Sequence, residues 1–214
     1  MRWFYEGRAC DTPDAANPKR GTAKADELAT YSGKIEFVSQ SLTKYFPDDK
    51  ERPPMARYIP SWEGPQSDLA AKYPLQLVSP HPRYSYHTHF DKHVEWMGEI
   101  PGHRVVKSGY AWWVARVHPS DAAQRRIREG DIIKLFNDRG AVLCIAHLTE
   151  RCKPGVVHSY ASCGKYDPIE PGKPYSIDRG GCVNLLTSAR MLSQNAPGMA
   201  PNSCLIEITK WEDG

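Results

Sequence analysis

The chain has 214 residues, with 28 Lys and Arg against 25 Asp and Glu and a formal net charge of +3. Because the two signs of charge are interspersed, this mild excess does not indicate nucleic-acid binding and is equally compatible with a phosphate-bearing ligand. The opening MRWFYEGRACD has no signal-peptide apolar core and no apolar run is long enough to span a membrane, so we expect a cytoplasmic chain without membrane insertion. Export as part of a larger assembly stays open.

Residues 1–70 do not have the pattern of an independent domain. Ser32 and Gly33 predict a turn before a short strand at 34–37, and residues 47–65 form a proline-rich connection. Apolar periodicity over these residues is too thin to bury a core. We expect an extended linker that lies on another part of the protein.

From Tyr73 onward the pattern changes to short strands and tight turns. A helix capped by Ser120 or Asp121 is expected to end near Ile127, and Asn137 to Gly140 predict a hairpin turn. The predicted strands are 75–78, 111–117, 132–136, 141–148, 156–158 and 204–208. Residues 71–214 therefore predict a mainly β domain with short helices, in a closed or nearly closed barrel.

The chain carries six cysteines without any C-x-x-C spacing: Cys10, Cys144, Cys152, Cys163, Cys182 and Cys204. This spacing indicates neither a zinc site nor a disulfide framework. Cys144 and Cys204 lie in strand-like runs, where a thiol acts as a small buried hydrophobe. We expect six unpaired thiols.

Residues 180–208 combine glycines, amides and hydroxyls in one segment that leads into the last strand. Backbone N–H groups and short neutral side chains suit a large polar ligand with phosphates and ring-edge acceptors. Asn184 is the strongest candidate for a ligand contact, because an amide between apolar neighbours needs a hydrogen-bond partner. That partner is either a ligand or two backbone segments that the amide bridges. Gly181 lacks a side chain and so allows a ligand to approach the backbone closely. Gln194 and Asn202 either form hydrogen bonds to the ring edges of the ligand or are ordinary loop residues.

The segment SPHPRYSYHTHFDKH holds the densest group of histidines. Its Arg, Tyr, Ser and Thr side chains donate hydrogen bonds that phosphate or carbonyl acceptors need, which predicts a ligand-contacting loop. One alternative is an ordinary surface loop that contacts no ligand. The other alternative is a stand-alone metal-dependent enzyme, with Asp91 adding an oxygen ligand to the histidines at positions His81, His87, His89 and His93.

No nucleophile elbow, phosphate loop, dinucleotide G-x-G-x-x-G motif or carboxylate pair marks a reaction centre. We expect Arg139 at a solvated hairpin tip, and a solvated helix face for Arg125, Arg126 and Arg128. By itself the chain is therefore predicted to be inactive.

Several blocks, taken in order, resemble the C-terminal molybdopterin dinucleotide-binding domain of the dimethyl-sulfoxide-reductase family. These blocks are residues 32–36, 73–85, 118–127, 130–131, 139–140, 154–155 and 181–187. Within that family, SPHPRYS and the ending NAPGMAPNSCLIEITKW look closest to pyrogallol–phloroglucinol transhydroxylase large subunits.

The resemblance implies a double-psi β-barrel that packs over bis-molybdopterin guanine dinucleotide, with the Mo or W held mainly by domains that this chain lacks. Those domains of the catalytic subunit, and an iron–sulfur subunit, are the implied partners; no catalytic or metal-ligating residue is carried over. By position, the implied cofactor-binding residues are Ser79, His81, Pro82, Arg83, Tyr84, Ser85, His87, Thr88, Gly181, Asn184, Thr187, Gln194 and Asn202.

Overall fold

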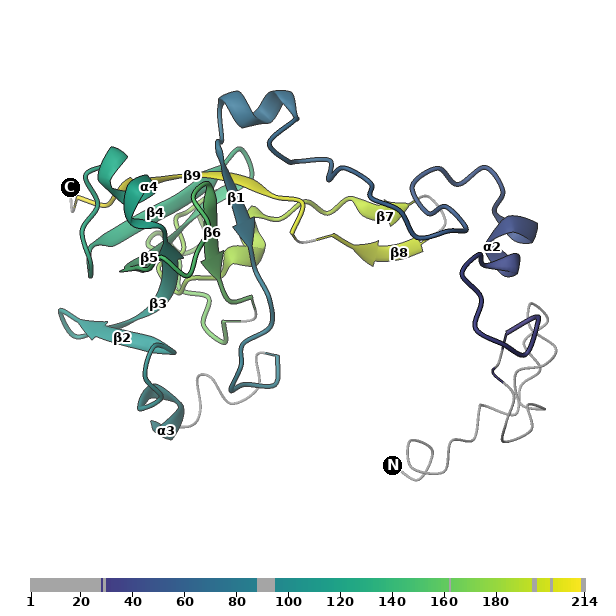
Figure 1. Cartoon of the computed structure of the whole chain (residues 1–214). Helices are drawn as coiled ribbons and strands as arrows, with labels where there is room; N and C mark the ends of the chain where they lie inside the picture. Colours follow the sequence, from purple (N-terminus) through teal and green to yellow (C-terminus); the bar gives the residue numbers. More distant parts are fainter. Residues whose placement is uncertain are drawn as a thin grey trace. The chain divides into compact units, whose positions relative to one another are not determined.

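Figure 1 shows the computed structural model, which describes residues 28, 30–87, 95–161, 163–193, 196–200 and 202–212. Its contacts divide the chain into two compact units. The first joins the residues up to Ile59 with Met191–Gly198, and the second joins Pro60–Arg190 with Met199–Gly214. The expected boundary after residue 70 stays a prediction, and the contacts assign residues 60–70 to the second unit.

The second unit contains a closed barrel of six strands. Hydrogen bonds run in the order β3-β5-β4-β9-β1-β6, and β6 pairs again with β3 to close the ring. A seventh strand, β2 (Arg104–Lys107), pairs only with β3 at the outside. The barrel strands are β1 (Leu75–Val78), β3 (Tyr110–Val117), β4 (Ile132–Asn137), β5 (Gly140–Leu148), β6 (Val156–Ser159) and β9 (Leu205–Lys210).

Two of the barrel's neighbouring pairs are parallel, β1 with β6 and β3 with β5, and the other four are antiparallel. Each parallel partner is reached by a crossover and not by a hairpin, because a tight turn can only reverse the chain. The mainly β double-psi barrel that the sequence predicted is confirmed, with every predicted barrel strand within two residues of its place.

The core lies inside the barrel and follows the alternation of each strand. Along β1 the side chains of Leu75 and Leu77 point inward, while Gln76 and Val78 are only half-buried. The other inward side chains with no more than 1% exposure include Ile133, Leu135, Val142, Cys144, Val157, Ile206 and Ile208. Burial of each Leu or Ile stabilises the fold by about 1.5–3 kcal/mol. Closure of the sheet therefore encloses one continuous apolar centre.

The cysteines of the described residues are all unpaired, as predicted for them: Cys144, Cys152, Cys163, Cys182 and Cys204. Cys144 and Cys204 are both fully buried. Burial raises the pKa of the Cys144 thiol to about 12, so it remains a neutral apolar group. Cys10 lies outside the described residues.

The helix α4 (Pro119–Gln124) begins two or three residues earlier than a cap at Ser120 or Asp121 predicted. Its cap is His118, whose Nδ1 accepts a hydrogen bond from the Ser120 N–H at 3.1 Å, so the expected cap at Ser120 or Asp121 is wrong. Pro119 explains the shift, because proline suits the first helical position. The Asp121 carboxylate is instead buried and accepts from Gly155 N–H at 2.7 Å. Arg126, at φ 56°, follows the helix and prevents its continuation to Ile127.

Three short helical segments complete the second unit: η1 (Asp68–Ala71), α3 (Glu95–Gly98) and η2 (Val183–Leu186). Within the described residues, no helix has the length and apolar character needed to cross a membrane.

The described residues of the first unit hold little regular structure. It contains α2 (Gln40–Tyr45), which Ser39 caps, and the strand pair β7 (Met191–Ser193) and β8 (Ala196–Met199). The short strand expected at 34–37 does not form; a single bridge joins Val38 to Met55 instead. None of the described apolar side chains of this unit is buried, and Phe37 is 86% exposed.

Candidate functional site

Two of the predicted cofactor-binding segments meet where β1 ends and β9 begins. The side-chain oxygen of Asn202 accepts a hydrogen bond from Ser79 N–H at 3.0 Å. Gln76 donates through Nε2 to the backbone oxygens of Asn202 and Cys204, at 2.7 and 2.9 Å. The contact between Ser79 and Asn202 spans 123 positions of sequence, and it fixes the start of the 79–87 loop beside the start of β9.

The 79–87 loop is anchored at its start and exposed beyond it. Ala161 N–H donates to the Pro80 oxygen at 2.9 Å, and Pro82 is buried. The hydroxyl of Ser79 is buried and has no hydrogen-bond partner among the residues that the structure describes. The remaining predicted ligand-contacting side chains of this loop are half-buried or exposed: His81, Arg83, Tyr84, Ser85 and His87. Thr88 lies outside the described residues.

Ring contacts order the exposed part of this loop. The His81 and His87 rings meet edge to face at 4.7 Å between centroids, and Tyr86 contacts His87 at 4.9 Å. The Arg83 guanidinium lies 5.3 Å from the centre of the Tyr84 ring. The Tyr84 ring therefore stabilises the position of the Arg83 guanidinium, whose N–H groups can donate hydrogen bonds to a ligand.

No observation favours the alternative of a histidine metal site. The part of the chain that the structure describes contains no group of three His, Cys, Asp or Glu able to hold a metal ion. His89, Asp91 and His93 lie outside the described residues.

The segment that leads into η2 is held by a buried carboxylate. Asp178 is 0% exposed and accepts three backbone N–H bonds, from Asp167 at 2.7 Å, Gly180 at 3.0 Å and Cys182 at 2.7 Å. A carboxylate with three such donors is well satisfied in spite of its burial. Asp178 therefore sets the path of the backbone up to Cys182.

Gly181 is required here by the protein's own packing. Its φ is +87°, and a Cβ at this position would overlap the side chain of Trp113. A Cβ at Gly180 would overlap the carbonyl of Lys165. The close approach that the sequence predicted is thus made to protein atoms, and contact of Gly181 with the cofactor stays a prediction.

Asn184 is exposed, so the expectation of an enclosed amide is wrong. In a 3₁₀-helix, residues three apart share a face. Val183 and Leu186 take the buried face of η2, which leaves Asn184 and Leu185 outside. Within the described residues the Asn184 side chain makes no hydrogen bond; only its carbonyl accepts, from the Thr187 hydroxyl at 2.9 Å. A ligand contact by Asn184 stays a prediction. So does one by Thr187, whose hydroxyl donates to the Asn184 carbonyl at the end of η2.

An ion pair that the sequence did not predict fixes the end of η2. Arg139 donates to the two carboxylate oxygens of Glu63 at 2.7 and 2.8 Å, so the expectation of a solvated hairpin tip is wrong. Arg139 Nε also donates to the Leu186 carbonyl at 2.6 Å. Glu63 in turn accepts from Leu205 N–H at 3.1 Å. Spacing gave no signal for this pair, because 76 residues separate its members.

The Leu186 carbonyl accepts from three side chains. Besides Arg139, Asn137 donates through Nδ2 at 2.8 Å and the Cys204 thiol donates at 3.2 Å. Burial raises the pKa of Cys204 to about 11, which keeps the thiol protonated and able to donate. Asn137 Nδ2 also reaches the Leu205 oxygen at 3.1 Å. Both η2 and the 79–87 loop are thereby fastened to residues 202–205.

Arg125 also departs from its prediction, because it pairs with Glu207 in a half-buried bridge of 2.5 Å. Arg126 and Arg128 are exposed, as predicted. Gln194 lies outside the described residues.

Comparison with known proteins gives the family. Residues 75–205 match the model "Molydopterin dinucleotide binding domain". The pyrogallol hydroxytransferase large subunit of Pelobacter acidigallici is 46% identical over 99% of this chain and 25% of its own length. Trimethylamine-N-oxide reductase of Haemophilus influenzae is 34% identical over 86% of this chain and 21% of its own length. Dimethyl sulfoxide reductase of Escherichia coli is 33% identical over 89% of this chain and 22% of its own length.

A solved structure supports the fold. Acetylene hydratase from Pelobacter acetylenicus superposes with a TM-score of 0.63 at 19% identity, over 88% of this chain and 25% of that one. The chain spans about a quarter of the length of the curated relatives that it matches. The match to the family model covers more than half of the residues, and the barrel is the one that the resemblance implied. The chain belongs to the molybdopterin dinucleotide-binding domain family.

Proposed function

We propose that this chain binds and orients molybdopterin guanine dinucleotide as the C-terminal part of a bis-dinucleotide molybdenum or tungsten enzyme, an oxidoreductase or hydroxytransferase. The printed names of its relatives, a hydroxytransferase and two reductases, support this class. The identity of 46% to the hydroxytransferase, against 34% and 33% to the reductases, favours the hydroxytransferase.

One observation carries the proposal: both predicted loops are bonded to the start of β9, and they hold polar groups that have no partner within the described part of the chain. Asn202 holds Ser79, while Asn137 joins Leu186 to Leu205. The loops are therefore positioned by backbone and side-chain bonds within the protein. Their outer side chains remain available to a ligand.

The available groups fit the chemistry of the cofactor. The buried Ser79 hydroxyl has no partner among the described residues, which costs about 1–3 kcal/mol unless another group supplies one. The exposed amide of Asn184 can both donate and accept, and it makes no bond within the described residues. Arg83 adds a guanidinium, which suits phosphate oxygens. A hydroxyl, an amide and a guanidinium together match the ring edges and the diphosphate of a dinucleotide.

The protein's part in the reaction is binding and orientation. When bound, the cofactor with its metal supplies the redox or hydroxyl-transfer chemistry. We place the metal's ligands in the larger remainder of a subunit such as the relatives have, and this chain alone turns over no substrate. An associated iron–sulfur subunit stays a prediction.

Calorimetric titration of the 214-residue chain with GDP tests the proposal, because GDP carries the guanine and diphosphate of the cofactor. We expect saturable binding that Asn184→Ala weakens about five- to hundredfold, the loss of one to three kcal/mol for a hydrogen-bonded partner. Lys173→Gln changes an exposed side chain that pairs with Glu170, and as the control it leaves the affinity unchanged. Equal GDP affinity in the Asn184→Ala variant and the parent chain would overturn the assignment of η2 to the dinucleotide.

A further inference from the structure

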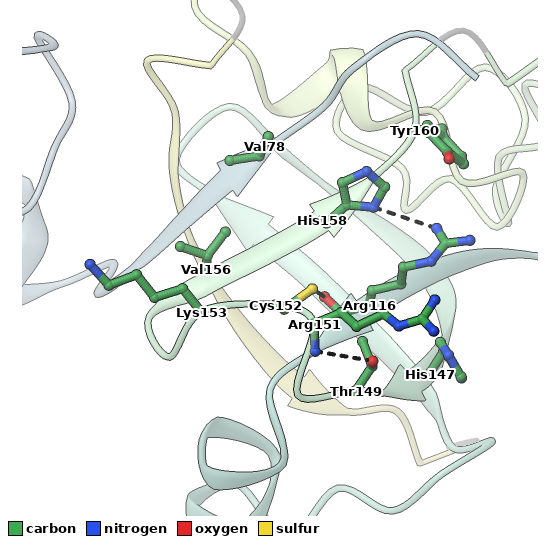
Figure 2. Close-up of a pocket in the computed structure, with 10 residues that line it drawn as sticks. All are labelled: Val78, Arg116, His147, Thr149, Arg151, Cys152, Lys153, Val156, His158 and Tyr160. Atoms are coloured by element: carbon green, nitrogen blue, oxygen red, sulfur yellow. Dashed lines mark hydrogen bonds between the residues drawn. The ribbon is translucent and has the colours of Figure 1, made fainter. Parts of the chain in front are cut away.

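A pocket lies on the outer wall of the barrel, and no residue of the 79–87 loop or of η2 lines it. It has a volume of about 440 Å³, and outward-facing residues of four strands line it together with the β5–β6 turn (Figure 2). The strands contribute Val78, Arg116, His147, Val156 and His158. The turn and the end of β6 contribute Thr149, Arg151, Cys152, Lys153 and Tyr160.

The lining of this pocket is cationic and lacks acids. It includes Arg116, Arg151 and Lys153, and none of its ten residues is Asp or Glu. Figure 2 shows the Arg116 and Arg151 guanidinium groups pointing the same way, with Lys153 at the opposite end. Within the described residues neither arginine has a carboxylate partner. Like charges in one pocket repel each other, and an anion removes that repulsion.

Arg116 is held in position for such an anion. It donates through Nη2 to the Gly102 oxygen at 3.2 Å, and its Nη1 lies 3.4 Å from His158 Nδ1. Its guanidinium carbon is 5.1 Å from the centre of the Tyr160 ring. These three contacts restrict the side chain, so less conformational entropy is lost when a ligand binds.

His158 can act as a neutral donor beside the arginine. Burial, and then the charge of Arg116, lower the pKa of His158 below its ordinary value. A neutral ring that accepts from Arg116 at Nδ1 carries its proton on Nε2. The Thr149 hydroxyl, which accepts from Arg151 N–H at 3.2 Å, retains a proton to donate.

We infer that this pocket is a binding site for a phosphate-bearing ligand, held by Arg116 and Arg151 with His158 and Thr149 as neutral donors. Two guanidinium groups and two neutral donors offer more hydrogen bonds than one carboxylate can accept, whereas a phosphoryl or diphosphate group can take them all. The inference goes beyond the proposed function, since none of the loops assigned to the dinucleotide lines this pocket.

Titration of the full 214-residue chain with inorganic pyrophosphate, in low-salt buffer free of phosphate, tests the inference. Arg151→Gln removes a cation from an exposed turn without touching the core and is expected to weaken binding about tenfold or more. Arg116→Gln is expected to do the same, and Lys153→Gln to have a smaller effect. Added NaCl should weaken binding by the parent chain.

Two controls decide the outcome. Arg128→Gln and Lys173→Gln each remove one positive charge at an exposed position outside the pocket; both should keep the parent's pyrophosphate affinity. Absent binding to the parent chain, or equal affinity in Arg128→Gln and Arg151→Gln, would overturn the inference. So would a loss in Asn184→Ala that Arg151→Gln does not share.

The source of the phosphate follows from a parallel titration with GDP. If Arg151→Gln and Asn184→Ala each weaken GDP binding, the pocket receives the diphosphate of the dinucleotide itself. If Arg151→Gln weakens pyrophosphate but leaves GDP unchanged, the ligand is a separate phosphate compound. Both results support a phosphate-binding site in this pocket. Only the second shows that its ligand is a compound other than the cofactor.

Discussion

At the scale of single residues, the Glu63–Arg139 pair helps to hold η2, because Arg139 also donates to the Leu186 carbonyl. Only 12% of the Glu63 side chain and 32% of the Arg139 side chain are exposed. Glu63→Gln leaves the Arg139 charge without its partner, and we expect a loss of about 2–3 kcal/mol in the free energy of unfolding, below the full value for a buried pair because Arg139 is partly hydrated. Urea denaturation measures this loss.

Lys173 and Glu170 form the matched control pair, because both side chains are more than half exposed. Lys173→Gln should leave the urea midpoint unchanged. A Glu63→Gln variant as stable as Lys173→Gln would mean that the pair does not hold the fold.

Asn184 gives a prediction of the opposite kind. Since its side chain is exposed and makes no hydrogen bond to any described residue, Asn184→Leu should change the free energy of unfolding by less than about 0.5 kcal/mol. The same variant should lose GDP affinity, because leucine has no polar atoms. Thermal unfolding and calorimetry on one preparation measure both quantities. A large loss of stability with unchanged affinity would assign Asn184 a structural role.

At the scale of elements, the approach of the η2 segment to β3 depends on a glycine. Gly181→Ala adds a methyl that overlaps Trp113 and is strained at φ +87°. We expect a loss of about 2–4 kcal/mol in the free energy of unfolding, which combines the left-handed backbone with overpacking. The tryptophan emission should also shift, because Trp113 must move.

Gly172→Ala separates these two contributions. Gly172 has φ +81° and nothing lies within 4 Å of its Cβ position, so the variant carries the backbone cost of about 1–2 kcal/mol alone. Equal losses in the two variants would show that the contact with Trp113 costs nothing.

At the scale of the whole molecule, the two units should respond differently to a protease. The first unit has exposed apolar side chains such as Ile35 and Phe37, whereas Glu63 is bonded to Arg139 and Leu205 within the barrel unit. Limited proteolysis should therefore cut before Pro60 first and leave a resistant fragment that retains Glu63. Mass spectrometry of the fragment reads the boundary. A fragment that begins near Tyr73 would place the boundary at residue 70, as the sequence alone predicted.

The sequence by itself determined the barrel strands and the family. Alternating apolar residues and the hairpin turn at Asn137 to Gly140 are local signals, and the strands they predict lie within two residues of those observed. Burial of one face of a strand depends on neighbours at a fixed spacing of two residues, which a sequence displays directly.

Tertiary structure decided the rest, because the deciding contacts join residues far apart in the chain. The partner of Arg139 is 76 positions away, and the partner of Ser79 is 123 positions away. The exposure of Asn184 followed from a 3₁₀ turn that buries Val183 and Leu186, which apolar neighbours alone did not reveal. The outer pocket is lined by residues of four neighbouring strands, β1, β6, β3 and β5, because a closed barrel brings together residues that the linear order separates.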